Sequence, residues 1–232
     1  MSDTADSRAT LLALFYPGPS VTAQLRKLDL AEHGFTVRSL LQETLPREVT
    51  AIDYATVLFE RCDLANTDVS TIVSYCAAGA IGCELLPMCA RATGRLPKVV
   101  RINPEFPTLD SLVRTIEATL RRPLPRRDPE VIPDLLTLQL FEELERELAA
   151  GYRRELGASG AEELSRMQID WVVHLVAAGT PSGHMDMADE LHITAADHAC
   201  DVGCTARHLV VCDNSEDLFS APGIVEAICL ER

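Results

Sequence analysis

The chain has 232 residues, of which 47% are hydrophobic and 24% are charged, a composition typical of a globular protein with a substantial core. Its formal net charge of -14 argues against nucleic acid and against an anionic membrane surface as partners. The sequence shows no signal peptide and no apolar run long enough to span a membrane, and it contains eight cysteines. We therefore expect a cytoplasmic protein with reduced thiols.

Apolar, β-branched runs alternate with helical patterns along the whole chain. Residues 1–9 are polar and are expected to form a flexible N-terminus, followed by one domain over residues 10–232. The predicted strands cover residues 10–16, 35–40, 69–75, 98–102, 169–178 and 207–212. The predicted helices cover residues 21–33, 49–62, 77–93, 109–120, 129–156, 162–168, 190–199 and 222–230. This alternation favours an α/β fold, with a mainly parallel sheet covered by helices on both faces.

A change in composition interrupts the alternation after residue 120. Residues 121–128 are rich in Arg and Pro, and residues 129–156 are acidic and strongly helical, with apolar side chains along one stripe. We predict that residues 121–168 form a helical lid, inserted over the edge of the sheet where α/β proteins bind their ligands.

A candidate reactive side chain lies where the third predicted strand meets its helix. Ser74, Cys76 and Ala78 form the pattern small-x-nucleophile-x-small between a β-branched run and an Ala-rich run. That pattern is typical of a nucleophile elbow, a tight strand-to-helix turn that exposes one reactive side chain. A cysteine at a helix N-terminus is expected to have a lowered pKa. The alternative from the local sequence is a buried core cysteine.

From about residue 11 to residue 230 the chain resembles an α/β-hydrolase thioesterase of the kind that serves polyketide and nonribosomal peptide synthases. Residues 14–18 (Leu-Phe-Tyr-Pro-Gly) are similar to the opening strand and loop of that family, and residues 74–78 match its elbow. The family usually has Gly at the flanks and often Ser at the centre, although versions with Cys are known. Residues 210–218 resemble the segment after the last strand, and residues 222–230 match the closing helix.

The resemblance implies an α/β-hydrolase fold with Cys76 as the nucleophile. It also implies an oxyanion hole made by the backbone of Ala77 and of the loop at Pro19 and Ser20. The substrate would be an acyl thioester on an acyl or peptidyl carrier protein, or on CoA. Hydrolysis, acyl transfer or cyclisation would follow, without a cofactor.

The chain departs from the family pattern at the other catalytic positions. The position of the catalytic His falls on Asn214, and one of the usual acid positions falls on Asn103. We place the alternative acid position in residues 179–186, where the sole aspartate is Asp186. An asparagine side chain cannot act as the base of a triad.

Three explanations are open for these departures. Cys76 could react as a thiolate without a base, or a displaced His184 (with Asp186) or His198 could serve as the base. The site could instead have lost its hydrolytic activity and could bind an acyl chain or a carrier protein without turnover. Without a base that activates water, an acyl-enzyme would lose its acyl group slowly to water and more readily to an amine or thiol.

Two other clusters need an interpretation. His198, Cys200, Cys204 and His208 have short spacings that zinc could use, but Cys-x3-Cys is not the usual knuckle, and we expect buried thiols and no metal. Arginines occur in pairs at residues 121–122 and 126–127. They could meet the acidic face or the phosphopantetheine phosphate of a carrier protein, or they could be a solvated connector.

Overall fold

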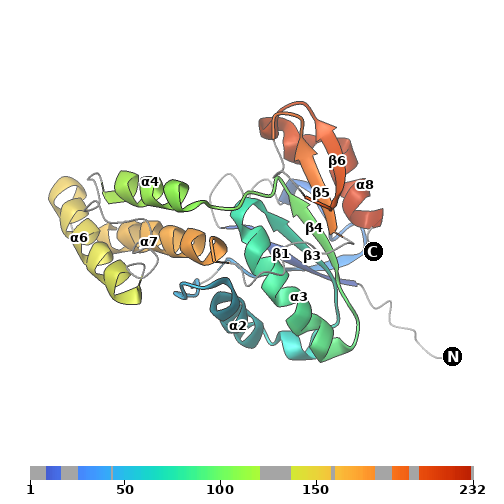
Figure 1. Cartoon of the computed structure of the whole chain (residues 1–232), viewed down its shortest axis with the longest axis horizontal. Helices are drawn as coiled ribbons and strands as arrows, with labels where there is room; N and C mark the ends of the chain where they lie inside the picture. The colour runs from blue at the N-terminus through green and yellow to red at the C-terminus, as the bar shows by residue number, and fades with distance from the viewer. Residues whose placement is uncertain are drawn as a thin grey trace.

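A computed structural model of the chain describes residues 9–16, 26–42, 44–120, 137–157, 160–180, 190–198 and 204–230. These residues contain a six-stranded sheet in which all neighbouring strands are parallel. The strand order is β2-β1-β3-β4-β5-β6, so β6 is an edge strand (Figure 1). The strands are β1 (Ala9–Leu14), β2 (Phe35–Ser39), β3 (Val69–Tyr75), β4 (Lys98–Ile102), β5 (Glu190–Ala195) and β6 (Arg207–Cys212).

Helices cover both faces of the sheet because the inner strands are apolar on both sides. Leu12, Leu14 and Ile72 pack in a core with α2 and α3, whereas Leu11 and Val73 point to the opposite face, where α8 packs. This period-two alternation separates two cores across one sheet. The helices are α2 (Ala51–Arg61), α3 (Gly79–Thr93), α4 (Leu109–Leu120), α6 (Leu138–Leu156), α7 (Ala161–Ala178) and α8 (Pro222–Leu230), with short 3-10 turns η1 (Leu64–Asn66), η2 (Cys76–Ala78) and η3 (Ser215–Ser220).

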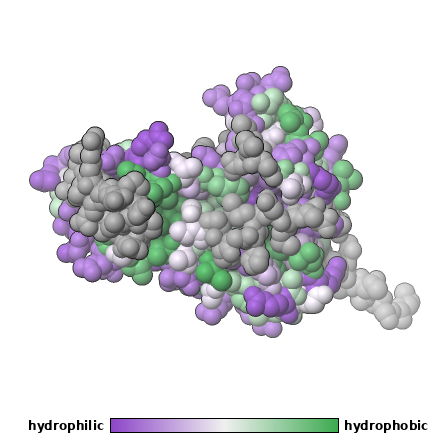
Figure 2. All heavy atoms as spheres, in the orientation of Figure 1, coloured by the Kyte–Doolittle hydropathy of each residue, from purple (hydrophilic) through white to green (hydrophobic). Residues whose placement is uncertain are grey.

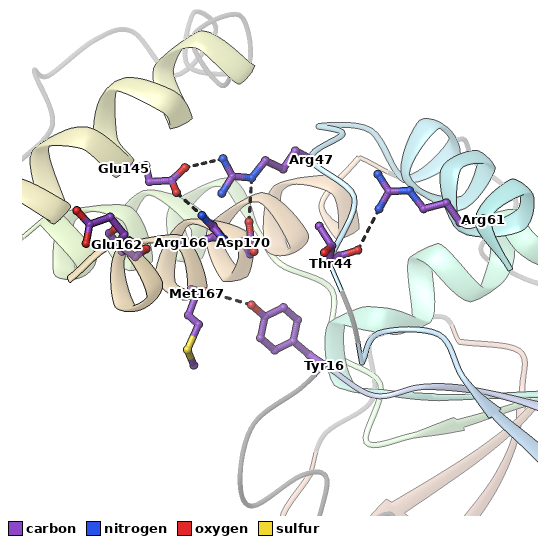
Figure 3. Close-up of polar contacts among 10 residues, drawn as sticks. Tyr16, Thr44, Arg47, Arg61, Glu145, Glu162, Arg166, Met167 and Asp170 are labelled. Atoms are coloured by element: carbon purple, nitrogen blue, oxygen red, sulfur yellow. Dashed lines mark hydrogen bonds and ion pairs between the residues drawn. The ribbon is translucent and has the colours of Figure 1, made fainter. Parts of the chain in front are cut away.

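Helices α4, α6 and α7, which we call the lid helices, lie together beyond one end of the sheet (Figure 1). Arg47, in the segment between β2 and α2, joins them to the rest of the protein. Its guanidinium donates to Glu145 on α6 at 2.5 Å and to Asp170 on α7 at 3.0 Å (Figure 3). The Tyr16 hydroxyl donates to the carbonyl of Met167 on the same helix at 3.3 Å. These contacts fix the lid helices over the carboxyl ends of the strands.

Two predicted elements are wrong. Residues 169–178, predicted as a strand, are the second half of α7, which buries Ile169, Val172, Val173 and Val176 at helical spacing. Residues 190–199, predicted as a helix, contain β5, and all six residues of this strand are buried. The sequence of β5 does alternate, with polar Glu190, His192 and Thr194 between apolar residues, so the period of a strand was present. The polar members are buried because the strand is covered on both faces and Glu190 pairs with Arg101.

The remaining elements agree with the sequence, except near the N-terminus. The helix predicted over residues 21–33 has ended by Leu28, because Asp29 takes a φ of +42° and turns follow as far as Gly34. Residues 1–8 and 17–25 lie outside the described residues, while residue 9 already belongs to β1. In the described part of the chain, no helix combines the length and the apolar character that crossing a membrane requires.

Candidate active site

Cys76 lies on a strained turn between β3 and α3. The strand ends at Tyr75 with extended backbone (φ -122°), and Cys76 then takes a φ of +54°. A side chain other than Gly, Asn or Asp rarely adopts this left-handed conformation, which costs about 1–2 kcal/mol. The following helix packs closely, since a Cβ at Gly79 would lie 3.4 Å from the side chain of Arg101. The tight strand-to-helix turn expected at this cysteine is therefore present.

The electrostatic environment of Cys76 is the reverse of what we expected from a helix N-terminus. Its half-buried thiol donates to the Glu105 carboxylate, with a distance of 3.3 Å from Sγ to Oε2. Burial, followed by the charge and hydrogen bond of Glu105, raises the pKa of Cys76 to about 12, although the backbone N–H of Ala77 opposes the rise. The expectation of a lowered pKa is wrong, because burial and an adjacent carboxylate outweigh the helix terminus.

The carboxyl ends of β4, β5 and β6 are joined by a network of hydrogen bonds. Asn103, which follows β4 at a φ of +42°, accepts from the backbone N–H of Ala195 at 3.1 Å and donates to the Ser215 hydroxyl at 3.0 Å. That hydroxyl donates to Asp197 at 2.7 Å, and the Ser215 backbone N–H donates to the same carboxylate at 3.1 Å. These two bonds hold the pKa of Asp197 below its usual range.

The network differs from the predicted set. Asn214 is exposed, and its side chain does not cap the 3-10 turn that follows it; the bond from Asn103 reaches its neighbour Ser215 instead. His198 lies 2.9 Å from the carbonyl oxygen of Pro104 through Nε2, and the recorded hydrogen bond of the Cys76 thiol goes to Glu105. Pro19, Ser20, His184, Asp186, Cys200 and the arginine pairs at 121–122 and 126–127 lie outside the described residues.

Three residues of the site were not predicted from the sequence. The sequence does not point to Asp197 because the strand predicted after β4 covers residues 169–178, and the acid position expected after it therefore falls in residues 179–186. The strand is β5, and Asp197 is the second residue after it. Glu105 follows Asn103 by two residues, so a carboxylate near the matched position was the available signal. Ser215 carried no signal, because the resemblance directed attention to Asn214.

A cavity of about 260 Å³ lies between the lid helices and the segment before α2. Three of its lining residues, Val49, Leu112 and Val176, belong to the same apolar cluster as Cys76 and Ala77. The space-filling view shows apolar side chains where the lid helices join the body of the protein (Figure 2). An apolar chain reaching from Cys76 would find matching surroundings there. The full lining is Val49, Thr50, Leu109, Leu112, Val176, Gly179 and Thr180.

An aromatic cluster surrounds the buried His174 on the inner side of α7. His174 is 1% exposed and packs against Tyr16, Tyr54 and Trp171, with ring centroids 5.0, 5.6 and 5.9 Å away. Burial alone lowers the pKa of His174 to about 3, so the imidazole is neutral at physiological pH. The aromatic cluster therefore acts as packing between α7, β1 and α2.

No family model matches the sequence, and no curated protein matches it significantly. Solved structures are similar across nearly the whole chain. They include the Vlm2 thioesterase domain bound with a dodecadepsipeptide (11% identity, 96% of this chain, 91% of that chain, TM-score 0.53). They also include the NocB thioesterase domain in covalent complex with a fluorophosphonate nocardicin G analog (13%, 97%, 96%, 0.52), and RedJ with a PEG molecule in its active site (15%, 98%, 95%, 0.51). RedJ is a thioesterase of the prodiginine biosynthetic pathway in Streptomyces coelicolor. Together with the six-stranded parallel sheet, these similarities show that the chain has the α/β-hydrolase fold, in a form also found in thioesterase domains.

Proposed function

We propose that this protein is a thioesterase-like acyl-transfer enzyme that uses Cys76 as its nucleophile. The observation that carries the proposal is the thiol on a strained turn at a φ of +54°, with the Glu105 carboxylate 3.3 Å from its sulfur. A turn that stores strain and presents one nucleophile is typical of catalytic sites. The neighbouring carboxylate of Glu105 supplies a proton acceptor beside the sulfur, a role for which the resemblance implies a histidine at the position of Asn214.

In the proposed step the sulfur of Cys76 attacks the carbonyl carbon of an acyl thioester while its proton passes to Glu105. The bond from that carbon to the leaving sulfur then breaks, and the leaving thiol takes the proton back from Glu105. One thioester replaces another, so the step balances without a redox partner. The backbone N–H of Ala77, at the start of the helical turn, is the proposed donor to the oxyanion. A second donor from the loop at Ser20 stays a prediction.

Removal of the acyl group is the step for which the site is less well equipped. Asn103, Asp197 and Ser215 already bond to one another. Within the part of the chain that the structure describes, no histidine is hydrogen-bonded to these three side chains. We therefore propose that the acyl group passes to an amine, hydroxyl or thiol acceptor, or cyclises, faster than it is hydrolysed.

The substrate we propose is an acyl or peptidyl group tethered to a carrier protein or to CoA. Support comes from the apolar cavity beneath the lid helices, which suits a chain of several carbons. The similar structures are thioesterase domains whose recorded ligands include a dodecadepsipeptide and a nocardicin G analog. We propose a role in natural-product biosynthesis, and this part of the proposal rests on analogy of fold.

A binding protein without turnover is the second candidate. It is favoured by the pKa of about 12 for Cys76, which leaves only about 1 thiol in 10⁵ ionised at pH 7. In that case the cavity would hold an acyl chain while the cysteine stays unmodified.

Intact-protein mass spectrometry after incubation with a panel of acyl-CoA and acyl-carrier thioesters separates the two candidates. We expect an acyl adduct on the wild type and none on Cys76→Ala. Cys62→Ala, which removes a thiol outside the site, is the matched control and should keep the adduct. A folded wild type without an adduct from any thioester would refute the enzyme, and acyl chains that still bind would support the second candidate.

A further inference from the structure

A second cluster of reactive side chains lies away from Cys76, at the β5–β6 edge of the sheet. His192 on β5 is the register partner of His208 on β6, and Cys204 lies just before β6. One ligand atom from each of the three lies within 4.8 Å of the other two, and Cys204 Sγ lies 3.4 Å from His192 Nδ1. His192 is buried, Cys204 is half-buried and His208 is exposed, so an ion could reach the cluster from solvent.

Glu190 orients His192 toward Cys204. Its carboxylate Oε2 lies 3.4 Å from His192 Nε2, while Oε1 accepts from the buried guanidinium of Arg101 at 2.6 Å. A carboxylate paired with an arginine only accepts, so Nε2 carries the proton and the lone pair of Nδ1 faces the Cys204 sulfur. A carboxylate that holds the far nitrogen of a histidine is the usual support of a metal ligand. A histidine that only filled space would not need this arrangement.

The distances are close to those of a bound zinc ion. In a tetrahedral site with bonds of about 2.0–2.3 Å, neighbouring ligand atoms are about 3.3–3.6 Å apart. The separation of Cys204 Sγ and His192 Nδ1 is already in this range, and the ligand atom of the exposed His208 needs to move by at most about 1.5 Å. Two imidazoles and one thiolate favour a borderline divalent ion over a hard one such as Mg²⁺.

From this geometry we propose that His192, Cys204 and His208 bind one Zn²⁺ ion. The ion links β5 to the edge strand β6 and leaves a fourth position open to solvent. The sequence had indicated a different set, since it grouped His198 with Cys204 and His208. In the structure, His198 Nε2 lies near the carbonyl oxygen of Pro104, and the histidine that lies beside Cys204 and His208 is His192. The site is separate from Cys76, because His192 lies three residues before the carboxyl end of β5.

Metal titration of the purified full-length protein tests this proposal. After removal of metal with a chelator, we expect the wild type to bind one equivalent of Zn²⁺ and to melt at a higher temperature with Zn²⁺ than without it. With Co²⁺ as the probe, we expect the absorption bands of a thiolate-ligated, tetrahedral ion. Cys204→Ser should abolish the thiolate-to-cobalt band, and His208→Gln should weaken binding by more than about 100-fold, since loss of a supporting partner alone costs about 10–100-fold.

The control variants distinguish binding at the cluster of His192, Cys204 and His208 from non-specific binding of the ion elsewhere on the surface. His33→Gln and Cys212→Ser remove an exposed histidine and a half-buried cysteine that take no part in the cluster, and both variants should bind the ion as the wild type does. Cys76→Ala should do the same, which makes this test independent of the proposed acyl transfer. Because His208 is exposed, its variant should fold, and circular dichroism checks this. The proposal is overturned if wild type and His208→Gln bind Zn²⁺ equally, or if Co²⁺ shows no thiolate band.

Discussion

Replacing Glu105 by Gln should move two reactivities of Cys76 in opposite directions. The carboxylate of Glu105 lies 3.3 Å from the sulfur, so it opposes ionisation of the thiol and, in our proposal, also accepts the proton during acyl transfer. The glutamine would keep the shape of the side chain but would carry no charge and accept no proton. Alkylation of the free thiolate should therefore become faster, while acylation by a thioester should become slower.

The size of the first effect follows from Coulomb's law. Two unit charges 3.3 Å apart interact by about 1.3 kcal/mol in a water-like medium and by about 5 kcal/mol at an effective dielectric constant of 20. Even the lower value corresponds to about ten times more thiolate. Since a less basic thiolate is also less nucleophilic, a tenfold gain in thiolate gives about a threefold gain in the alkylation rate.

The second effect should be larger and opposite in sign. General-base assistance contributes about 100-fold or more to the rate of the step it serves, so we expect acylation of E105Q to be at least tenfold slower after the gain in thiolate is allowed for.

The assay pairs two measurements on Cys76: the alkylation rate of its peptide, read by mass spectrometry, and the rate of acyl-adduct formation. Glu32→Gln, at an exposed position outside the site, is the control and should change neither. Faster acylation of E105Q would refute the role of Glu105 as base, and unchanged alkylation would refute the electrostatic argument.

Three further changes test the fold around the site. Arg47→Ala removes the ion pairs of Arg47 with Glu145 and Asp170 and should destabilise the protein by about 1–2 kcal/mol, with faster hydrogen exchange in α6 and α7. Asn103→Ala leaves the buried N–H of Ala195 without an acceptor and places a non-Asn residue at a φ of +42°, so unfolding should become easier by about 2–4 kcal/mol in a denaturant titration. His174 has a folded pKa of about 3 below an unfolded value near 6.5, so the unfolded chain takes up a proton first, and stability should fall by about 1.4 kcal/mol per pH unit as the pH falls from about 6.5 toward 3.

Each of these changes has its own check. For the lid, the control is Arg95→Ala, because its ion pair with Asp68 is exposed and should contribute little. Asn103→Gly loses the same hydrogen bonds but accepts the left-handed backbone, so it should be less destabilised than Asn103→Ala; equal losses would contradict the strain argument. For the buried histidine, His174→Gln should show a flatter loss of stability between pH 7 and pH 5 than the wild type, and parallel curves would exclude His174 as the acid-sensitive group.

The turn at Cys76 was predictable from sequence because its constraints are local. A β-branched run, a cysteine and a helix that begins with small residues all lie within a dozen residues. The two elements that were wrong, residues 169–178 and β5, are both almost fully buried. Residues 169–178 are mostly apolar, and such a run fits a buried strand and a buried helix equally well. β5 alternates polar and apolar residues, and what the local sequence does not specify is that its polar members are buried in the folded sheet.

The electrostatics of the site could not be predicted, because they depend on contacts between distant segments. Glu105 meets Cys76 across 29 residues, and Ser215 meets Asn103 across 112. The sequence indicates the helix N-terminus at Cys76 but not the carboxylate that lies beside its sulfur. The predicted direction of the pKa shift of Cys76 was wrong for this reason. The proximity of His192 to Cys204 and His208 could not be seen in the sequence for the same reason: His192 lies on β5 and His208 on β6, which are neighbours only in the folded sheet.

The side chains at the carboxyl ends of β3, β4, β5 and β6 suggest that acylation of Cys76 would be faster than hydrolysis of the acyl-enzyme. The thiol at the end of β3 has a proton acceptor, whereas the ends of β4, β5 and β6 are occupied by Asn103, Asp197 and Ser215, which bond to one another. Acylation needs only a proton acceptor beside the sulfur, and Glu105 is that acceptor. Hydrolysis needs a base directed at water, and the end of the sheet where it is expected holds a hydroxyl that is already bonded to a carboxylate. Ser215→His would place an imidazole next to Asp197. If the acyl-enzyme is protected because no described residue at these strand ends activates water, the adduct of this variant should be lost to water faster than that of the wild type.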